Sequence, residues 1–367
     1  MMRIEKFTIL YRDVTKEGTK IPQEKYCLTG QFPIVDQGQR IIAGWWNDDD
    51  GIFKDVPAII FGDHTRAIKY MEEPFFIGAD GVKILRPTNV RDNPKYLYYA
   101  LQAAKIPKLG YSRHFKVVKE LEIRMYSRDE QDEIVRVLEK IDYLIEQRHA
   151  ETTYLDQLVK SRFIELFGDP KQNPKGYPVK KFDEISVLIT DGEHATPRRT
   201  DKGIYLLSAR NILNHALQLD DVNYIDEEEY TRIARRVVPQ AGDVLISCSG
   251  SIGRCCVVPE ELRFQMVRSA ALIRFDDTIN PVFAEWLITS DELQRQISMS
   301  ATQSSQANLF QGKIRKLRGY MPPMELQEQF AAFVEQTDKS KFYIVQMQIL
   351  LRLLIRAIQQ KTTEVLL

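Results

Sequence analysis

Two long stretches of this sequence place apolar residues at alternating intervals of four and three, the spacing of a helix that buries one stripe. The first stretch runs from Ile134 to Leu166 and ends before Gly168 and Pro170, which stop helices. The second begins after Pro323, because proline can start a helix but not continue it backwards. A helix of about 40 residues is about 60 Å long, and neither stripe can be buried without a partner.

We predict that the two stripes pair as an intramolecular antiparallel coiled coil. Two unrelated bundle helices remain the alternative. Ser127 followed by Glu130 forms a capping-box pattern at the start of the first helix. The predicted stripe positions are Ile134, Leu138, Ile141, Ile145, Thr152, Leu155, Val159 and Leu166 in the first helix, and Phe330, Val334, Thr337, Ile344, Leu351, Ile355, Ile358 and Val365 in the second.

The sequence repeats itself at an offset of 196 residues, which aligns Gln131 with Gln327 and Asp142 with Asp338. The regions before the helices also agree. Residues 56–85 and 241–275 each indicate an apolar strand, a polar turn with glycine, and two more strands. A duplication of this length predicts a pseudo-twofold molecule rather than a solenoid.

The predicted fold class is therefore α+β, with two globular α/β domains separated by the two long helices. We place the first domain at 1–120, the central helical region at 121–168, the second domain at 169–320 and the C-terminal helical region at 321–367.

Charge is balanced overall, with 51 Lys and Arg against 51 Asp and Glu, but it is unevenly distributed. Residues 1–120 carry 19 basic and 15 acidic side chains, whereas residues 121–170 carry 7 and 12. A polyanion would therefore contact the outer regions rather than the central helix. The four cysteines have no zinc spacing, and no apolar run approaches 18 residues. We expect a cytoplasmic protein with no membrane segment.

Motifs for chemistry are absent. The sequence has neither a phosphate-binding G-x-x-x-x-G-K-[ST] nor a G-x-G-x-x-G after a strand, and its five histidines are scattered. Asp63 and His64 are adjacent in "FGDHTR", but neighbours on a strand face opposite ways. We therefore predict no catalytic residue, no metal site and no cofactor on this chain. An autonomous enzyme is the third and weakest interpretation.

Polar side chains of the types that contact DNA gather instead in loops at similar places in both halves. "GYSRHFK" and "QSSQANLFQGK" correspond, and "DGEHATPRRT" and "SGSIGR" add further donors. Ordinary solvated loops are the alternative for each residue. The candidate DNA-binding residues are His64, Arg66, Lys69, Ser112, Arg113, His114 and Lys116 in the first domain, and His194, Arg198, Arg199, Arg210, Arg254, Ser305, Gln306 and Asn308 in the second.

This order of domain, helix, domain, helix resembles the specificity subunit of type I restriction-modification systems. "PMELQEQF" and "SRDEQDEI" resemble the starts of the family's helical regions, and "FIELFGDP" resembles the exit of its central helix. "FPIVDQGQRIIAGWWNDDD", with the segment from "FGDHTR" to "GVKIL", and "AGDVLISCSGSIGRCCVVPE" resemble two types of its target recognition domain. The first domain departs from the pattern, because it lacks a counterpart of "DGEHATPRRT".

The resemblance implies a subunit that does no chemistry and binds double-stranded DNA with a split target, each domain recognising one half. It implies two methyltransferase subunits docked along the helices, and restriction subunits that translocate DNA. S-adenosylmethionine, ATP and Mg are then expected on those partners, in a bacterial or archaeal cytoplasm. The leading alternative is a coiled-coil scaffold with two protein-binding domains.

Overall fold

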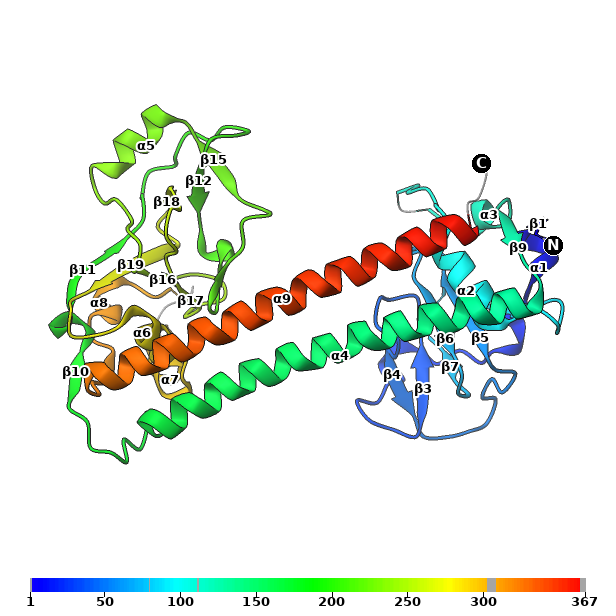
Figure 1. The fold of residues 1–367 in the computed structure, drawn as a ribbon, viewed down its shortest axis with the longest axis horizontal. Coiled ribbons are helices and arrows are strands. Elements are labelled where there is room, and N and C mark those ends of the chain that lie inside the picture. Colours follow the sequence, from blue (N-terminus) through cyan, green and yellow to red (C-terminus); the bar gives the residue numbers. More distant parts are fainter. Residues whose placement is uncertain (1, 79, 111, 302–307, 364–367) are drawn as a thin grey trace. The chain divides into compact units, whose positions relative to one another are not determined.

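The computed structural model describes residues 2–78, 80–110, 112–301 and 308–363 (Figure 1). The chain forms two compact units. Unit 1 comprises Met1–Ala150 and Ile344–Leu367, and unit 2 comprises Glu151–Tyr343. The boundaries drawn from the sequence gave each long helix a region of its own, whereas each compact unit includes half of both helices. The difference arises because the helix ends pack on the globular part next to them.

Unit 1 contains an antiparallel sheet in the strand order β2 (Tyr11–Asp13), β8 (Val82–Pro87), β5 (Ala58–Gly62) and β6 (Ile68–Met71). The apolar run "AIIFG" makes β5 buried at every position. A second sheet has the order β4 (Gly44–Trp46), β3 (Phe32–Val35) and β7 (Phe76–Ile77), in which β3 and β7 are parallel. A two-stranded ribbon pairs β1 (Arg3–Lys6) with β9 (Glu122–Met125).

Unit 2 contains an antiparallel sheet in the order β11 (Ser186–Asp191), β19 (Ala270–Phe275), β16 (Val244–Ser247) and β17 (Cys255–Val257). Its second sheet has the order β15 (Asn223–Ile225), β12 (Ile204–Leu207) and β18 (Phe264–Met266), with β12 and β18 parallel. Two ribbons pair β10 (Val179–Lys181) with β20 (Arg318–Tyr320) and β13 (Ile212–Leu213) with β14 (Ala216–Leu217).

The sheets of the two units correspond strand by strand, which confirms the internal repeat at the level of topology. Each unit has a four-stranded antiparallel sheet, a three-stranded sheet with one parallel pair, and a ribbon that closes the globular part. The isolated bridges Lys20 to Ile77 and Glu193 to Val267 lie at matching places. The segment between β2 and β3 is therefore the topological counterpart of "DGEHATPRRT", which the sequence comparison had not found.

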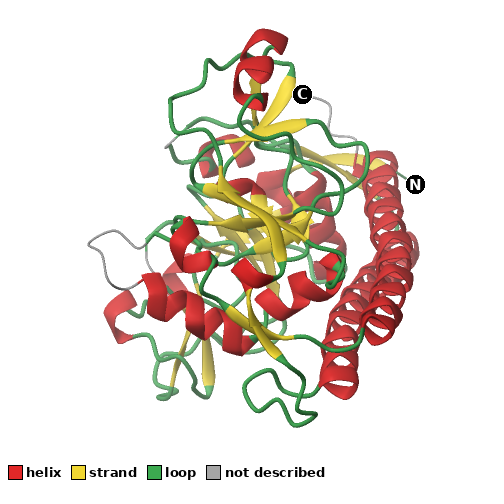
Figure 2. Ribbon diagram, turned by 90° about the vertical axis from the view of Figure 1, so that its left-hand side faces the viewer, coloured by secondary structure: helices red, strands yellow, loops and turns green. Residues whose placement is uncertain are grey.

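Short helices complete the mixed fold (Figure 2). Those of unit 1 are α1 (Phe7–Leu10), α2 (Pro94–Ala103) and α3 (Phe115–Val118), and those of unit 2 are α5 (Glu227–Ala234), α6 (Pro281–Ile288), α7 (Asp291–Ala301) and α8 (Gln311–Ile314). Single 3-10 turns occur at Thr15–Glu17, Gln23–Lys25, Phe182–Glu184 and Ala209–Asn211.

The two predicted long helices are present as α4 (Arg128–Phe167) and α9 (Met324–Thr363), each of 40 residues. The predicted capping box is also present, since the Ser127 backbone N–H donates to the Glu130 carboxylate at 2.9 Å. Gly168, with a φ of 77°, follows α4 in the left-handed conformation that ends helices.

The buried stripe of α4 differs from the prediction in two ways. Val135 is buried and Ile134 only half-buried. Ile145, Thr152 and Leu155 are half-buried and belong to none of the core clusters among the described residues. The reason is that the ends of α4 pack on a globular core, whereas these middle positions have no such core beside them.

Within each unit, the start of one long helix contacts the end of the other. In unit 1, Ile355 and Ile358 of α9 pack on the cluster that holds Leu138 of α4. In unit 2, the rings of Phe163 and Phe330 lie 5.4 Å apart. The other predicted stripe residue at the far end, Val365, lies outside the described residues.

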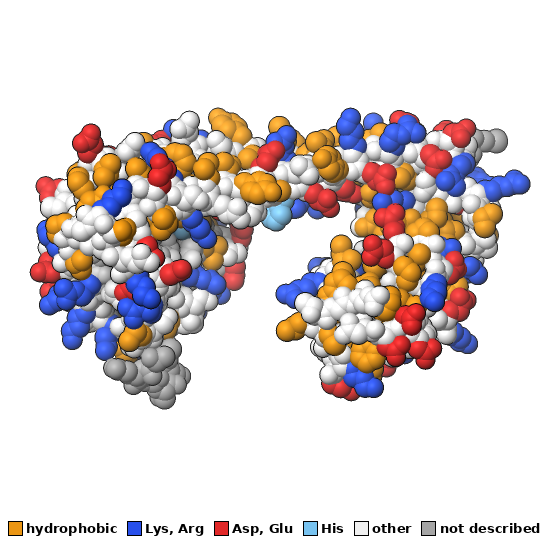
Figure 3. All heavy atoms as spheres, turned by 90° about the horizontal axis from the view of Figure 1, so that it is seen from below, with side chains coloured by type: hydrophobic (Ala, Val, Ile, Leu, Met, Phe, Trp, Pro, Cys, Tyr) orange, Lys and Arg blue, Asp and Glu red, His pale blue; other side chains and the backbone are white. Residues whose placement is uncertain are grey.

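The middle of α9 exposes apolar side chains. Figure 3 shows hydrophobic side chains among charged ones on the face seen from below. By length and composition this helix could cross a membrane, and only 6% of its most apolar stretch is buried. The sequence analysis considered unbroken apolar runs, and glutamines interrupt this one; the expectation of no membrane segment stays a prediction. The exposed residues are Phe342, Tyr343, Val345, Met347, Ile349, Leu350, Leu353 and Leu354.

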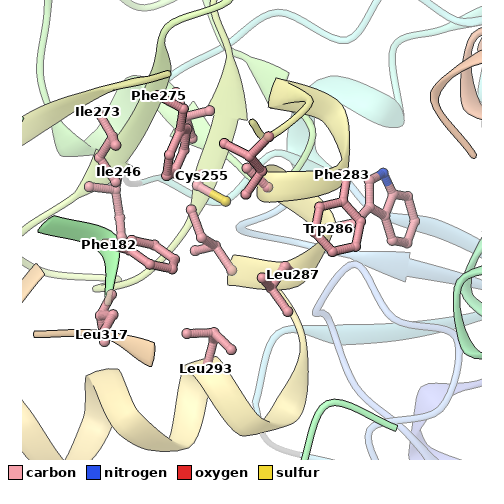
Figure 4. Close-up of a cluster of buried hydrophobic side chains, with 14 of the residues drawn as sticks. Phe182, Ile246, Cys255, Ile273, Phe275, Phe283, Trp286, Leu287, Leu293 and Leu317 are labelled. Atoms are coloured by element: carbon pink, nitrogen blue, oxygen red, sulfur yellow. The ribbon is translucent and has the colours of Figure 1, made fainter. Parts of the chain in front are cut away.

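The core of unit 2 joins its four-stranded sheet to the helices (Figure 4). Phe182, Ile246 and Phe275 come from the sheet side, and Phe283 and Leu287 come from α6. All are at most 9% exposed. Burial of such side chains contributes about 1.5–3 kcal/mol each, so this cluster fixes the sheet on α6 and on the long helices.

A buried glutamine at the start of each long helix holds the neighbouring short helix. Gln131 Oε1 accepts a hydrogen bond from the Asn93 backbone N–H at 2.7 Å, and Gln327 Oε1 accepts one from the Asn280 N–H at 2.8 Å. Each glutamine also donates to the carbonyl five residues before it. Asn93 and Asn280 cap α2 and α6, so the repeat aligned by sequence extends to hydrogen bonds.

Candidate nucleic-acid interface

The turn that follows β5 is held by its own backbone. The Arg66 N–H donates to the Gly62 carbonyl at 2.7 Å, and Arg66 adopts a positive φ of 62°. A side chain at Gly62 would meet Thr65 at 2.3 Å, so glycine is required there. Asp63 is 4% exposed, which removes its carboxylate from solvent.

Asp63 instead anchors the loop 112–116. Its carboxylate accepts from the Phe115 N–H at 2.7 Å, and its carbonyl accepts from the His114 N–H at 2.9 Å. Asp63 is therefore a structural joint between two segments, and the histidine that it contacts is His114 rather than the adjacent His64. The joint brings the 62–67 turn and the 112–116 loop together.

Two candidates in unit 1 are corrected because their side chains are buried and satisfied. His114 is 2% exposed; its Nδ1 donates to the Asp63 carbonyl at 2.9 Å and its Nε2 accepts from the Leu109 N–H at 3.2 Å. Lys69 is 5% exposed and donates to the Asp36 carbonyl at 2.7 Å. Burial lowers the pKa of Lys69, although the charge of Asp36 opposes the shift. Neither group can reach DNA in this fold.

The other unit 1 candidates differ in exposure, and the hydroxyl oxygen of Ser112 is itself buried. Arg113 and Lys116 are exposed, and His64, Arg66 and Ser112 are half-buried. The Arg66 guanidinium donates to the Ile106 carbonyl at 3.0 Å, which fixes part of its length. Contact of these five residues with DNA stays a prediction.

In unit 2 the turn after β16 has a similar construction. The Ser247 hydroxyl donates to the Ser251 carbonyl at 2.6 Å and accepts from the Arg254 N–H at 3.0 Å. The Leu309 N–H donates to the Cys248 carbonyl at 2.9 Å, which places half-buried Asn308 beside this turn. Arg254 is half-buried. The candidates Ser305 and Gln306 lie outside the described residues.

The loop 192–203 contains candidates with different environments. Arg198 binds Asp226 at 2.9 Å and Glu228 at 2.8 Å. The hydrogen bond to Glu228 and the charge of Asp226 raise the pKa of Arg198. Two carboxylates of the unit hold this exposed guanidinium, which makes Arg198 the weakest of the exposed candidates; its contact with DNA stays a prediction. His194 Nε2 lies 2.8 Å from the Asp191 carboxylate.

Arg199 and Arg210 are both exposed and line one small cavity of about 270 Å³. Ser208 and Asn223 share that cavity, and neither was a candidate. Ser208 is two residues from Arg210 in the sequence, whereas Asn223 begins β15 and reaches the two arginines only through the folded sheet.

Potential metal ligands and thiols were located among the described residues. No group of three His, Cys, Asp or Glu side chains there could hold a metal ion. Cys248, Cys255 and Cys256 are buried; burial raises the pKa of Cys248 to about 12 and raises those of the other two as well. Such thiols are inert.

A larger cavity of about 960 Å³ lies in unit 2 beside α4, α6, α7 and α9. Here the His215 ring stacks on Trp286 at 4.1 Å, and His215 Nδ1 lies 3.2 Å from the buried Glu285 carboxylate. The hydroxyls of Thr289 and Ser290 on its wall donate to backbone carbonyls. The His215 and Glu285 pair therefore activates neither hydroxyl.

No family model matches the sequence, and no curated protein matches it. Solved structures do match over nearly the whole chain. The type I restriction-modification S subunit from M. genitalium has a TM-score of 0.60 at 14% identity, covering 99% of this chain and 96% of that one. A chain from a structure of type I restriction-modification complex assembly and conformational transition has a TM-score of 0.59 at 16% identity, covering 98% and 97%.

These similarities extend over both units and both long helices, as the order of elements derived from the sequence requires. The chain therefore has the fold of the specificity subunits of type I restriction-modification systems.

Proposed function

We propose that this chain is a non-catalytic subunit that binds double-stranded DNA in a sequence-specific manner within a type I restriction-modification complex. Each unit recognises one half of a split target. The observation that carries the proposal is the duplicated topology, in which two matching units each present polar loops beside the same central sheet. A split target needs two reading units of this kind.

We also infer that α4 and α9 form an antiparallel coiled coil with pseudo-twofold symmetry. The contacts of Phe163 with Phe330 in unit 2, and of Ile355 with the Leu138 cluster in unit 1, support this pairing. The coil sets the spacing between the two half-sites.

The partners in this proposal are two methyltransferase subunits and the restriction and translocase subunits. S-adenosylmethionine, ATP and Mg belong to those chains. The exposed apolar residues of α9 support protein docking along the helices, because exposed patches of this kind mark interaction sites. In this proposal the complex is cytoplasmic, in a bacterium or archaeon.

The isolated chain is expected to show no methyltransferase, nuclease or ATPase activity. The reason is that its sequence lacks phosphate-binding and methyl-donor motifs. Methyl transfer from labelled S-adenosylmethionine to mixed-sequence DNA measures the first activity. Transfer that persists through a final purification step and scales with this chain would contradict the assignment.

Replacing Leu350 and Leu354 of α9 with aspartate is expected to weaken methyltransferase binding at least 30-fold. The two side chains are 65% and 48% exposed, so the fold tolerates the change, while a buried interface would receive unpaired charges. Calorimetric titration with the methyltransferase subunit gives the affinity. Gln336→Asp with Ser340→Asp, the same change at exposed polar positions of α9, is the matched control.

The same variants distinguish a protein surface from a membrane surface. Flotation with vesicles of anionic and neutral phospholipid should leave the wild-type chain in the soluble fraction. If the wild-type chain floats with the vesicles and the Leu350 and Leu354 variant does not, the exposed apolar residues of α9 bind lipid instead.

Mapping of methylated adenines in DNA treated with the chain and its methyltransferase partner tests the proposal as a whole. We expect two short fixed sequences separated by an unread gap. A coiled-coil scaffold with two protein-binding domains is the second candidate, favoured by the large cavity beside the helices. DNA affinity with a steep dependence on salt supports the first, since phosphate contacts release counterions. A scaffold shows neither the affinity nor the dependence.

A further inference from the structure

The small cavity of unit 2 lies at the ends of two parallel strands. Leu206 of β12 and Val267, directly after β18, form its apolar part. Arg199, Arg210 and Asn223 bring polar groups from three separate segments (Figure 1 labels β12, β15 and β18). A site lined by two guanidinium groups favours an anion.

A buried asparagine fixes the segments around this cavity. Asn211 is 1% exposed; its Oδ1 accepts from both the backbone N–H and the hydroxyl of Ser208 at 3.0 Å. Its amide donates to the Asp221 carbonyl at 3.0 Å. One side chain therefore ties the strand end that precedes Arg210 to the segment that leads into Asn223, so the cavity wall is held in place.

The two arginines of the cavity have weaker carboxylate partners than other arginines of unit 2, or none among the described residues. Arg198, Arg263 and Arg274 each bind a carboxylate at 2.6–2.8 Å. Arg199 has no ion pair within the described chain. Arg210 lies 3.4 Å from Asp221, which is 79% exposed, and a pair of this kind contributes little. The cavity consequently keeps uncompensated positive charge.

We propose that this cavity binds one phosphate of the DNA backbone, with Arg199 and Arg210 on its oxygens and the Asn223 amide as a further donor. The assignment rests on the proposed function and deepens it. A phosphate has two free oxygens and can accept from both guanidinium groups at once. A guanine edge is satisfied by one bidentate arginine, so a base would leave the second arginine unpaired.

The matching place in unit 1 cannot do the same. There β3 and β7 form the parallel pair, and the residue after β3 is Asp36, where unit 2 has Ser208 after β12. At this strand end, the buried side chain of Lys69 binds Asp36. The phosphate clamp formed by Arg199, Arg210 and Asn223 therefore belongs to unit 2 alone. The two units hold the DNA backbone differently.

The test uses the full chain and a fluorescently labelled 40-base-pair DNA duplex of arbitrary sequence, with affinity measured by anisotropy across a salt series. The Arg199→Gln and Arg210→Gln double variant is expected to bind about tenfold more weakly at low salt. Its slope of log affinity against log salt should be shallower by about one, the contribution of one phosphate. Arg198→Gln is the matched control, because this adjacent arginine is paired within the unit, and should keep the wild-type slope.

The outcomes separate the clamp from the proposed function. A wild-type chain without salt-dependent DNA affinity contradicts the proposed function itself. A wild-type chain that binds steeply, with a double variant of the same slope, overturns the clamp alone. The clamp is also overturned if the double variant, assembled with its methyltransferase partner, methylates a changed sequence, because the arginines then read bases. Equal binding of a duplex RNA of the same sequence would overturn the assignment to DNA.

Discussion

Replacement of Phe330 with alanine is expected to destabilise unit 2 by about 3–5 kcal/mol. Phe330 is fully buried, and its ring lies 5.4 Å from Phe163, 5.6 Å from Phe167 and 5.9 Å from Trp286, in each case edge to face. Removal of the ring loses its transfer free energy and leaves a cavity among side chains from three helices, which cannot close it without moving.

Urea unfolding followed by tryptophan fluorescence measures the loss. The chain has three tryptophans, so Trp45→Phe and Trp46→Phe leave Trp286 as the only reporter, inside unit 2. Phe342→Ala, on the same helix but at a side chain 59% exposed, should change the free energy of unfolding by less than about 0.5 kcal/mol. Equal losses in the two variants would show that Phe330 is not the anchor of α9.

The long helices could be predicted from the sequence because their signals are local and repeated. The capping box at Ser127 and Glu130 starts α4, and Gly168 ends it. Pro323 stands directly before α9, which begins at Met324. Period, cap and stop agree at α4, and period and the preceding proline agree at α9; such agreement needs no knowledge of the rest of the fold.

The three-stranded sheets could not be predicted in the same way. Strand β7 has two residues and β3 has four, too few for a periodic pattern to emerge. Their parallel pairing joins segments separated by about 40 residues of chain, so only the finished fold reveals it. The counterpart of "DGEHATPRRT" in unit 1 was missed for this reason, because its equivalence lies in topology and not in residue type.

The candidate residues were separable only by tertiary contacts. Lys69 and Arg113 are both basic residues, and the sequence does not distinguish their roles. Lys69 is buried and bound to Asp36, whereas Arg113 is exposed. Arg198 and Arg199 are adjacent, yet among the described residues only the first has carboxylate partners. A donor buried inside the protein, such as that of Lys69, is unavailable to DNA, and the partner that binds it comes from a distant segment.

Four-residue insertions in both long helices, after Ala150 in α4 and after Tyr343 in α9, are expected to lengthen the unread gap of the target by one to two base pairs. Four helical residues add about 6 Å along the axis, and one base pair occupies about 3.4 Å. Both insertions are needed, since α4 and α9 each pass from one unit to the other at these residues. An insertion in α4 alone shifts its stripe against that of α9 and should impair assembly.

Methylation-site mapping of the variant complexes decides whether the helices act as the spacer. A matched pair of seven-residue insertions adds one heptad, about 10.5 Å or three base pairs, and keeps the stripe on its face. The gap should therefore grow with insertion length while both half-site sequences stay unchanged, because neither reading unit is altered. Half-sites that change over a constant gap would mean that the loops, and not the helices, set the distance between the recognised bases.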